Sequence, residues 1–168
     1  VIKGENFHIT EANILEGFRT VFWPGRFEIL RRNPPVIIDS AHNPDSALKL
    51  RLTLDDYLPG TKVIMVFGAS EDKDVRGMFG ELLPRISSII TTSSVLPRAM
   101  AAQELADLAL QFGCPAKAVV PVEEALAEAL RQAGNEMAVL VSGSLFVAAA
   151  TREIWQNSYS PLRTFEAT

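Results

Sequence analysis

Val36-Ile37-Ile38-Asp39-Ser40-Ala41-His42-Asn43-Pro44 is the stretch that decides the fold. It opens with three β-branched apolar residues, and polar residues follow them at once. The apolar run is too short for a helix and is typical of a strand that is buried on both faces. Asn43 before Pro44 is typical of a helix start, because asparagine caps a first turn and proline fits its first position. The stretch therefore predicts a buried strand, a polar loop and then a helix.

The same alternation continues along the chain. Short apolar runs that predict strands occupy residues 36–38, 62–67, 88–91, 116–122 and 137–141. Amphipathic stretches that predict helices occupy residues 45–58, 74–86, 99–112, 123–133 and 145–156. Helices between buried strands supply the crossovers that parallel pairing requires. We therefore expect an α/β fold with a doubly wound, mostly parallel sheet of about six strands, flanked by helices.

One further strand is expected outside this rhythm. Residues 27–31 precede Asn33-Pro34-Pro35, which predicts a hairpin and hence an antiparallel strand beside residues 36–38. The first 20 or so residues do not follow the strand–helix pattern. Residues 13–18 predict a short helix there, as part of a preceding domain or linker.

Composition limits the possible functions. The chain has 168 residues, 48% apolar and 21% charged, which suits one globular α/β domain. A net charge of −4 without a basic stripe argues against nucleic-acid binding. Cys114 is the single cysteine, which excludes an internal disulfide and fits a cytoplasmic location. The sequence shows neither a bilayer-spanning stretch nor a signal peptide, and it begins with Val1 rather than methionine. We expect it to be part of a longer protein.

Polar residues follow four of the predicted strands. In an open α/β sheet, ligands bind beyond the carboxyl ends of the strands. The loops expected at that edge are residues 39–44, 68–74, 91–98 and 142–144. All four contain small and polar residues, which suits a cleft lined by amides and hydroxyls.

Two interpretations of the loop at residues 39–44 remain open. A buried Asp39 needs hydroxyls, amides or a cation as partners, and His42 can donate or accept a proton near neutral pH. These residues could bind a ligand, or Asp39 and Asn43 could only cap the turn while His42 lies at the surface. The residues alone do not decide between the two.

The other polar residues that could bind a ligand could equally have a purely structural role. Lys73 could await an anionic ligand, or it could pair with Asp72 or Asp74. Ser142 and Ser144 flank Gly143 at a helix start and could bind a carboxylate or phosphate, or only cap the helix. Arg26 has the fork geometry that suits phosphate, although an arginine at a strand start is ordinarily a surface residue.

Several known motifs are missing from the sequence. It contains no G-x-x-x-x-G-K-[ST] P-loop, no G-x-G-x-x-G fingerprint and no G-x-S-x-G elbow. His8 lies far along the chain from any carboxylate cluster of metal-ligand type, so we expect no metal site. The chain alone shows no complete set of catalytic residues.

Five segments in order carry a resemblance to a known family. They are W-P-G-R-F-E from Trp23, D-S-A-H-N-P from Asp39, F-G-A-S-E-D-K-D from Phe67, L-P-R-A from Leu96 and V-S-G-S-L-F from Val141. Together they resemble folylpolyglutamate and dihydrofolate synthases of the Mur ligase superfamily, over roughly residues 14–156. The first segment favours the folate branch over cell-wall Mur ligases and cyanophycin synthetase.

The resemblance implies a Rossmann-like C-terminal domain of an ATP-dependent ligase. In that family, a preceding P-loop domain binds ATP and magnesium, and L-glutamate is joined to a folate or dihydropteroate through an acyl phosphate. Residues 1–22 would then be a segment or linker from the preceding domain, 23–157 the ligase domain and 158–168 a tail. Members are typically monomers, and a chain without the P-loop domain is expected to be inactive.

The same resemblance assigns roles to individual residues. Arg26 would reach the nucleotide phosphates, and Asp39 would hold the ribose hydroxyls of ATP. His42 would lie beside the nucleotide or the incoming glutamate. Lys73, with Ser142 and Ser144, would belong to the glutamate pocket.

One departure and two alternatives accompany this assignment. The family usually has glycine where this chain has Ser40, and serine tolerates a positive φ poorly, so we expect a slightly different turn. Another Mur-type amino-acid ligase is one alternative. The other is a non-catalytic α/β domain that binds a small anion or a protein partner, and a P-loop upstream of Val1 would argue against it.

Overall fold

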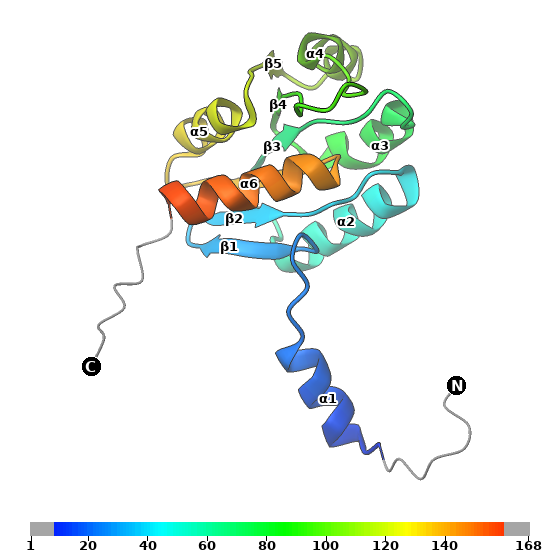
Figure 1. Cartoon of the computed structure of the whole chain (residues 1–168), viewed down its shortest axis with the longest axis vertical. Coiled ribbons are helices and arrows are strands. Elements are labelled where there is room, and N and C mark those ends of the chain that lie inside the picture. Colours follow the sequence, from blue (N-terminus) through cyan, green and yellow to red (C-terminus); the bar gives the residue numbers. More distant parts are fainter. Residues whose placement is uncertain (1–8, 160–168) are drawn as a thin grey trace.

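A six-stranded sheet forms the centre of the protein (Figure 1). The computed structural model describes residues 9–159. The strands are β1 (Glu28–Arg32), β2 (Pro35–Ile38), β3 (Val63–Phe67), β4 (Ser88–Thr91), β5 (Ala116–Ala118) and β6 (Ala138–Ser142). Their order is β1-β2-β6-β3-β4-β5, with β1 antiparallel to β2 and the other pairs parallel. The predicted fold class and the antiparallel hairpin strand are confirmed.

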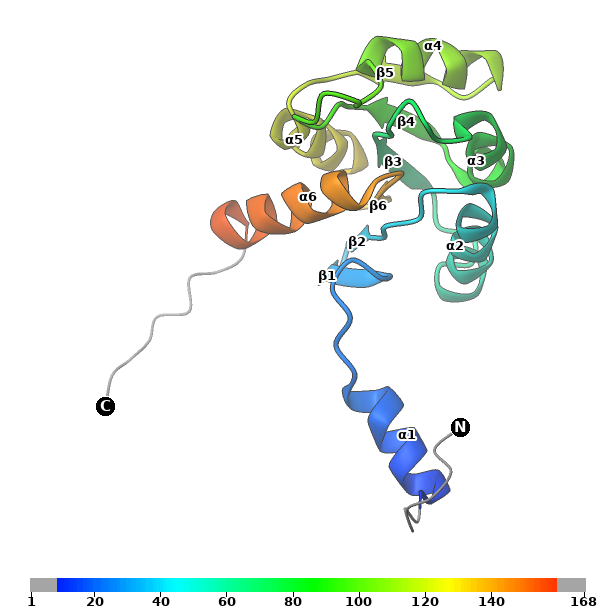
Figure 2. The same cartoon turned by 45° about the vertical axis from the view of Figure 1, so that its right-hand side comes forward.

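Helices cover both faces of the sheet. The helices of residues 9–159 are α1 (Glu11–Thr20), α2 (Pro44–Tyr57), α3 (Val75–Leu82), α4 (Ala102–Gln111), α5 (Val122–Ala133) and α6 (Leu145–Ser158), with a 3₁₀ turn, η1, at Leu83–Arg85. All of these α-helices except α1 pack on the sheet. Helices α2, α3 and α4 pack on one face, and α5 and α6 on the other (Figure 2). None of the helices in this described part is long and apolar enough to cross a membrane.

The central strands explain why both faces need a cover. All five residues of β3 and of β6 are buried, as continuous apolar runs predict for parallel strands. Alternate side chains of a strand point to opposite faces. Met65 and Phe67 accordingly pack under α2 and α3, whereas Ile64 and Val66 pack under α5 and α6.

Three predicted elements differ clearly in length from those observed. The strand expected over 116–122 ends at Ala118, because Pro121 has no N–H for the ladder and Val122 already begins α5. The helix expected over 74–86 ends at Leu82, and η1 carries Pro84 in its first turn. The helix expected at 13–18 is the longer α1.

Helix α1 stands apart from the sheet (Figures 1 and 2). None of its residues is buried, and its large apolar side chains Ile14, Leu15 and Phe18 are exposed. Its first turn is capped by Thr10, whose side chain accepts a hydrogen bond from the Asn13 N–H. Hydrogen bonds within the helix and its cap therefore stabilise α1, and packing against the core of the sheet does not.

The turn between β6 and α6 approaches β3 closely. Gly143 has a φ of +98°, and a Cβ placed there would lie 2.6 Å from the carbonyl oxygen of Gly68 and from the Phe67 ring. A side chain at this position would strain the backbone and also displace β3. Glycine is therefore required at position 143, in the turn that connects β6 to α6.

We predict that Gly143→Ala lowers the free energy of unfolding by about 2–4 kcal/mol, through backbone strain and overpacking. Gly80→Ala is the matched control, since Gly80 lies in α3 with open space around it. That variant is expected to gain about 0.5–1 kcal/mol. Urea unfolding of both variants measures the difference, and similar effects would contradict the close approach.

Candidate functional site

Three loops at the carboxyl edge of the sheet are joined by backbone hydrogen bonds. The Asp39 N–H donates to the carbonyl of Val141 at 2.9 Å, and the Gly143 N–H donates to that of Ala41 at 3.1 Å. The Gly68 N–H donates to the carbonyl of Ser142 at 3.3 Å. The loops after β2, β6 and β3 therefore form one continuous edge, as the polar strand ends predict.

The turn before β1 belongs to this edge as well. The Phe27 N–H donates to Asp39 Oδ2 at 2.9 Å, and the Ser40 N–H donates to the carbonyl of Gly25 at 2.8 Å. The other carboxylate oxygen of Asp39 accepts from the Ala41 N–H at 2.8 Å. Two of the five segments that carry the family resemblance, those from Trp23 and from Asp39, are thus hydrogen-bonded to each other.

Burial is the main influence on the Asp39 carboxyl and raises its pKa above the ordinary value. The N–H groups of Phe27 and Ala41 and the positive charge of Arg26 act in the opposite direction and lower it. The carboxylate has about four acceptor positions, and backbone groups take two of them. The remaining positions can accept hydrogen bonds from ligand hydroxyls.

Backbone strain lies at Phe27 and not at Ser40. Among residues 9–159, Phe27 is the one non-glycine residue with a positive φ, at +43°. Ser40 therefore needs no glycine-like conformation, and the expected distortion from the serine is not found. Its N–H instead holds the turn that contains Phe27 in place.

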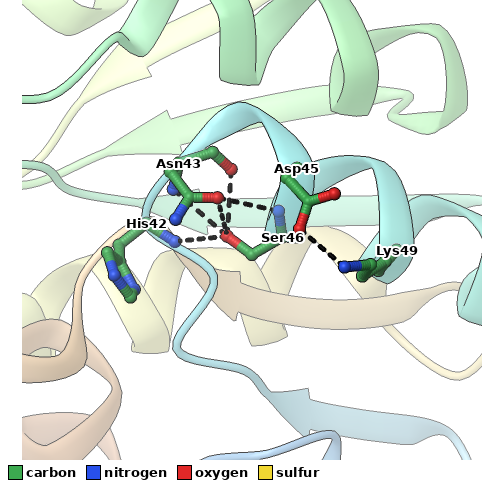
Figure 3. Close-up of polar contacts among 5 residues, drawn as sticks. All are labelled: His42, Asn43, Asp45, Ser46 and Lys49. Carbon is green, nitrogen blue, oxygen red and sulfur yellow. Dashed lines mark hydrogen bonds and ion pairs between the residues drawn. The ribbon is translucent and has the colours of Figure 1, made fainter.

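His42 is half-buried and its ring points away from the start of α2 (Figure 3). Its Nδ1 lies 2.9 Å from the carbonyl oxygen of Ser40. Because a carbonyl oxygen only accepts, we assign the proton to Nδ1. In the neutral ring this leaves Nε2 as an acceptor.

Asn43 caps α2, as the sequence predicts. Its Oδ1 accepts from the Ser46 N–H at 2.8 Å, and Ser46 Oγ in turn accepts from the N–H groups of His42 and Asn43 (Figure 3). The partner role of Ser46 was not predicted, although a polar residue three positions after a cap is the available signal. This reciprocal cap fixes the backbone that carries His42.

Lys73 lies in the loop after β3 and pairs with Asp72 at 2.9 Å. Its side chain is 33% exposed, and the hydrogen bond lowers the pKa of the Asp72 carboxyl. The Glu71 N–H donates to the carbonyl of Arg98, which joins this loop to the one after β4. Arg98 was given no role from the sequence, yet its positive charge also lowers the pKa of the Asp72 carboxyl.

The two serines of the β6–α6 turn are placed differently. Ser144 caps α6, since its Oγ accepts from the Phe146 N–H at 3.2 Å. Ser142 is fully buried, and its Oγ has no hydrogen-bond partner in the described structure. A ligand that approaches this turn meets Ser144 and the free N–H groups of the first helical turn before it meets Ser142.

The described residues provide no obvious metal centre. No group of three or more His, Cys, Asp or Glu side chains within residues 9–159 is arranged to hold a metal ion. His8 lies outside the described residues. What the edge does offer is a set of cations, a half-buried carboxylate, an imidazole and a capped helix start. Fold and edge together define an open, doubly wound α/β domain of the ligand-binding type.

Comparisons with known proteins identify the family. The family described as Mur ligase, glutamate ligase domain, matches residues 25–145. A Bacillus subtilis protein named dihydrofolate synthase/folylpolyglutamate synthase is 30% identical over 146 residues, which are 87% of this chain and 34% of that protein. The chain belongs to the Mur ligase family, as a glutamate ligase domain of the folylpolyglutamate synthase/dihydrofolate synthase type.

Solved structures agree with this membership. Mycobacterium tuberculosis folylpolyglutamate synthase complexed with ADP and AMPPCP has a TM-score of 0.82 and 28% identity, covering 92% of this chain and 36% of its own. A bifunctional folylpolyglutamate synthase/dihydrofolate synthase with Mn, AMPPNP and L-glutamate bound has a TM-score of 0.77 and 29% identity, covering 89% and 36%. The chain spans about a third of the length of these relatives.

We predict that Asp39→Ala lowers the free energy of unfolding by about 2 kcal/mol, because the N–H groups of Phe27 and Ala41 lose their acceptor. Asp45→Ala serves as the control, since Asp45 pairs with Lys49 on the exposed face of α2. That loss is expected to stay below about 0.5 kcal/mol. Equal unfolding midpoints for the two variants in urea would show that Asp39 does not hold the edge together.

Proposed function

We propose that this chain is the C-terminal domain of an ATP-dependent ligase that adds L-glutamate to a folate or to dihydropteroate. The observation that carries the proposal is the hydrogen-bonded unit of Asp39, Ser40 and the turn at Gly25–Phe27. It places an arginine, a carboxylate and an imidazole at one edge, in a chain whose relatives are named for this activity.

The nucleotide part of the proposed site uses Arg26, Asp39 and His42. Arg26 is exposed and bears a permanent charge with fork geometry, which suits phosphate oxygens. Asp39 retains acceptor positions for the two ribose hydroxyls of ATP. The Nε2 acceptor of His42 faces a donor of the nucleotide or the ammonium of the incoming glutamate.

The glutamate part of the proposed site uses Lys73 and the β6–α6 turn, together with His42. Lys73 attracts a carboxylate, although Asp72 competes for its charge. Ser144 and the free N–H groups of the first turn of α6 suit the other carboxylate, because a helix start favours anions. We propose Ser142 as a supporting member, since its hydroxyl is buried below this turn.

The proposed reaction has two steps. The folate carboxylate attacks the γ-phosphorus of ATP and releases ADP, which leaves an acyl phosphate. The glutamate amine then attacks the acyl carbon and releases phosphate. In both steps this chain binds and orients ATP and glutamate, and Arg26 stabilises the negative charge on the phosphoryl group. Magnesium would neutralise the phosphates, and we propose that a preceding P-loop domain of the same polypeptide holds it.

The wider setting is part of the same proposal. The chain spans about a third of its relatives, which leaves room for the P-loop domain. We propose a cytoplasmic, monomeric enzyme, with domain boundaries in this chain at residues 22/23 and 157/158.

A second candidate function is that of a ligase for diaminopimelate. It rests on a 32% identity over 141 residues with a Thermosynechococcus vestitus ligase named for 2,6-diaminopimelate. Offering glutamate and diaminopimelate separately to the full-length polypeptide decides between them.

We predict that two substitutions in the full-length polypeptide separate the two ligands. Arg26→Ala raises the KM for ATP about tenfold or more, and Lys73→Ala does so for glutamate, since each removes a charge-assisted hydrogen bond. Each variant should leave the other KM within about twofold. Glutamate incorporation measures both, with Lys49→Ala on α2 as the unaffected control. The same change in both variants would refute this division of the site.

The 168-residue chain by itself is predicted to lack ligase activity, because nothing in its sequence forms a P-loop. ATP hydrolysis is measured with folate and glutamate present, and only background release of phosphate is expected. Hydrolysis that depends on both substrates would overturn the assignment of ATP to a preceding domain.

A further inference from the structure

A partly buried ion pair joins the first residue of β1, just after the turn that carries Arg26, to helix α6. Arg152 Nε donates to Glu28 Oε1 at 2.9 Å, across 124 positions of the sequence. The Glu28 side chain is 12% exposed and that of Arg152 is 30% exposed. The second oxygen of Glu28, Oε2, accepts from the Gly25 N–H at 2.8 Å. One carboxylate therefore links α6 to the backbone just before Arg26.

The remaining atoms of Arg152 are also engaged. Its Nη1 and Nη2 lie 3.2 Å from the side-chain oxygen of Gln156, in the amide orientation that satisfies both groups. Its guanidinium lies over the Phe22 ring, 5.6 Å from the centroid. Arg152 is thus held by Gln156 of its own helix, while it contacts Phe22 before β1 and Glu28 at the start of β1.

The turn needs such support because close packing holds it at Phe27, which packs against the core and the Tyr57 ring, but not at Trp23 or Arg26. Gly25 has a φ of +70° and Phe27 a φ of +43°, so the backbone here adopts strained or glycine-specific conformations. Trp23 is 69% exposed, and Arg26 is exposed. A cleft of about 240 Å³ lies between the turn and α6, lined by Pro24, Gly25, Ile38, Leu145, Ala148, Ala149, Arg152, Glu153 and Gln156. Polar contacts span this cleft, in place of packed apolar side chains.

Four backbone contacts together fix the position of Arg26. The Gly25 N–H is bound by Glu28 and the Gly25 carbonyl by Ser40, while the Phe27 N–H is bound by Asp39. The Arg26 N–H donates to the carbonyl of Trp23 at 3.2 Å. Three of these contacts come from the edge and from within the turn. The contact through Glu28 is the one that depends on Arg152, because only Arg152 holds that carboxylate toward α6.

We propose that Arg152 is a positioning residue for the ligase reaction, which acts through Glu28 and Gly25 on Arg26 and contacts neither substrate. This rests on the proposed function of Arg26 at the ATP phosphates. Without Arg152, the Glu28 carboxylate turns toward the solvent of the cleft and the turn loses its anchor to α6. Arg26 then samples several positions, and phosphoryl transfer suffers from misplacement of its charge.

The kinetic test uses the full-length polypeptide. Arg152→Ala is expected to lower kcat/KM for ATP about tenfold, mainly by raising the KM for ATP, and to leave the KM for glutamate within about twofold. Arg152→Lys keeps a cation within reach of Glu28 and should recover most of the loss. In an Arg26→Ala background, Arg152→Ala should cost less than about twofold more, since both changes act through one group.

A matched control separates positioning from stability. Arg131 pairs with Glu128 on α5 through the same guanidinium–carboxylate contact, and the Glu128 side chain is 14% exposed. Arg131→Ala is expected to leave the KM for ATP unchanged. A role of Arg152 in stability alone would lower the melting temperature and the active fraction but leave the KM for ATP at the wild-type value, and this result would overturn the proposal. If the losses in kcat/KM caused by Arg152→Ala and by Arg26→Ala are independent in the double variant, that result would overturn the proposal as well.

A second measurement does not depend on ligase activity. Amide hydrogen exchange in the 168-residue chain, followed by NMR, reports directly on the turn. Arg152→Ala should speed exchange of the Gly25 and Phe27 amides at least tenfold and leave the amide of Val141, at the centre of the sheet, unchanged. Unchanged exchange at Gly25 and Phe27 would refute the positioning role. If the wild-type polypeptide does not ligate glutamate, the proposed function fails, and this exchange measurement alone decides the role of Arg152.

Discussion

The carboxylate of Asp39 accepts one backbone N–H from Phe27 and another from Ala41, and the architecture of the edge depends on this arrangement. It closes the loop that follows β2 and fastens the turn that precedes β1. Since β2 is paired with β6 in the buried centre of the sheet, that turn is held over the carboxyl ends of the strands. An exposed arginine is thereby placed at an edge that the core makes rigid.

The charges of the molecule are distributed in a way that suits an anionic ligand. The chain carries a net charge of −4, yet Arg26, Lys73 and Arg98 lie in loops of one edge. Glu71, Asp72 and Asp74 lie in the same loop as Lys73, and Asp72 pairs with it, so the edge carries charges of both signs. The Asp39 carboxylate is half-buried and its oxygens face backbone N–H groups. Arg26 is thus an exposed cation that no ion pair of the described residues engages.

Local patterns in the sequence were enough for the fold and for part of the site. Continuous apolar runs identified the buried strands, and Asn43 before Pro44 identified the start of α2. Contacts between distant residues left no such pattern. Nothing local to Glu28 indicates that it pairs with Arg152, or that Phe27 and not Ser40 adopts the unusual φ. The end of β5 was predicted too late for a different reason, because apolar residues continue past it into α5.

Hydrogen exchange of the full-length polypeptide, measured by mass spectrometry with and without a non-hydrolysable ATP analogue, tests the central claim most directly. The claim is that the turn at residues 23–28 and the loop at 39–43 form one nucleotide-binding unit. The analogue should slow exchange in peptides from both segments together and leave residues 116–134, at the far side of the sheet, unchanged. Exchange that stays the same in both segments while the analogue is bound would contradict the claim.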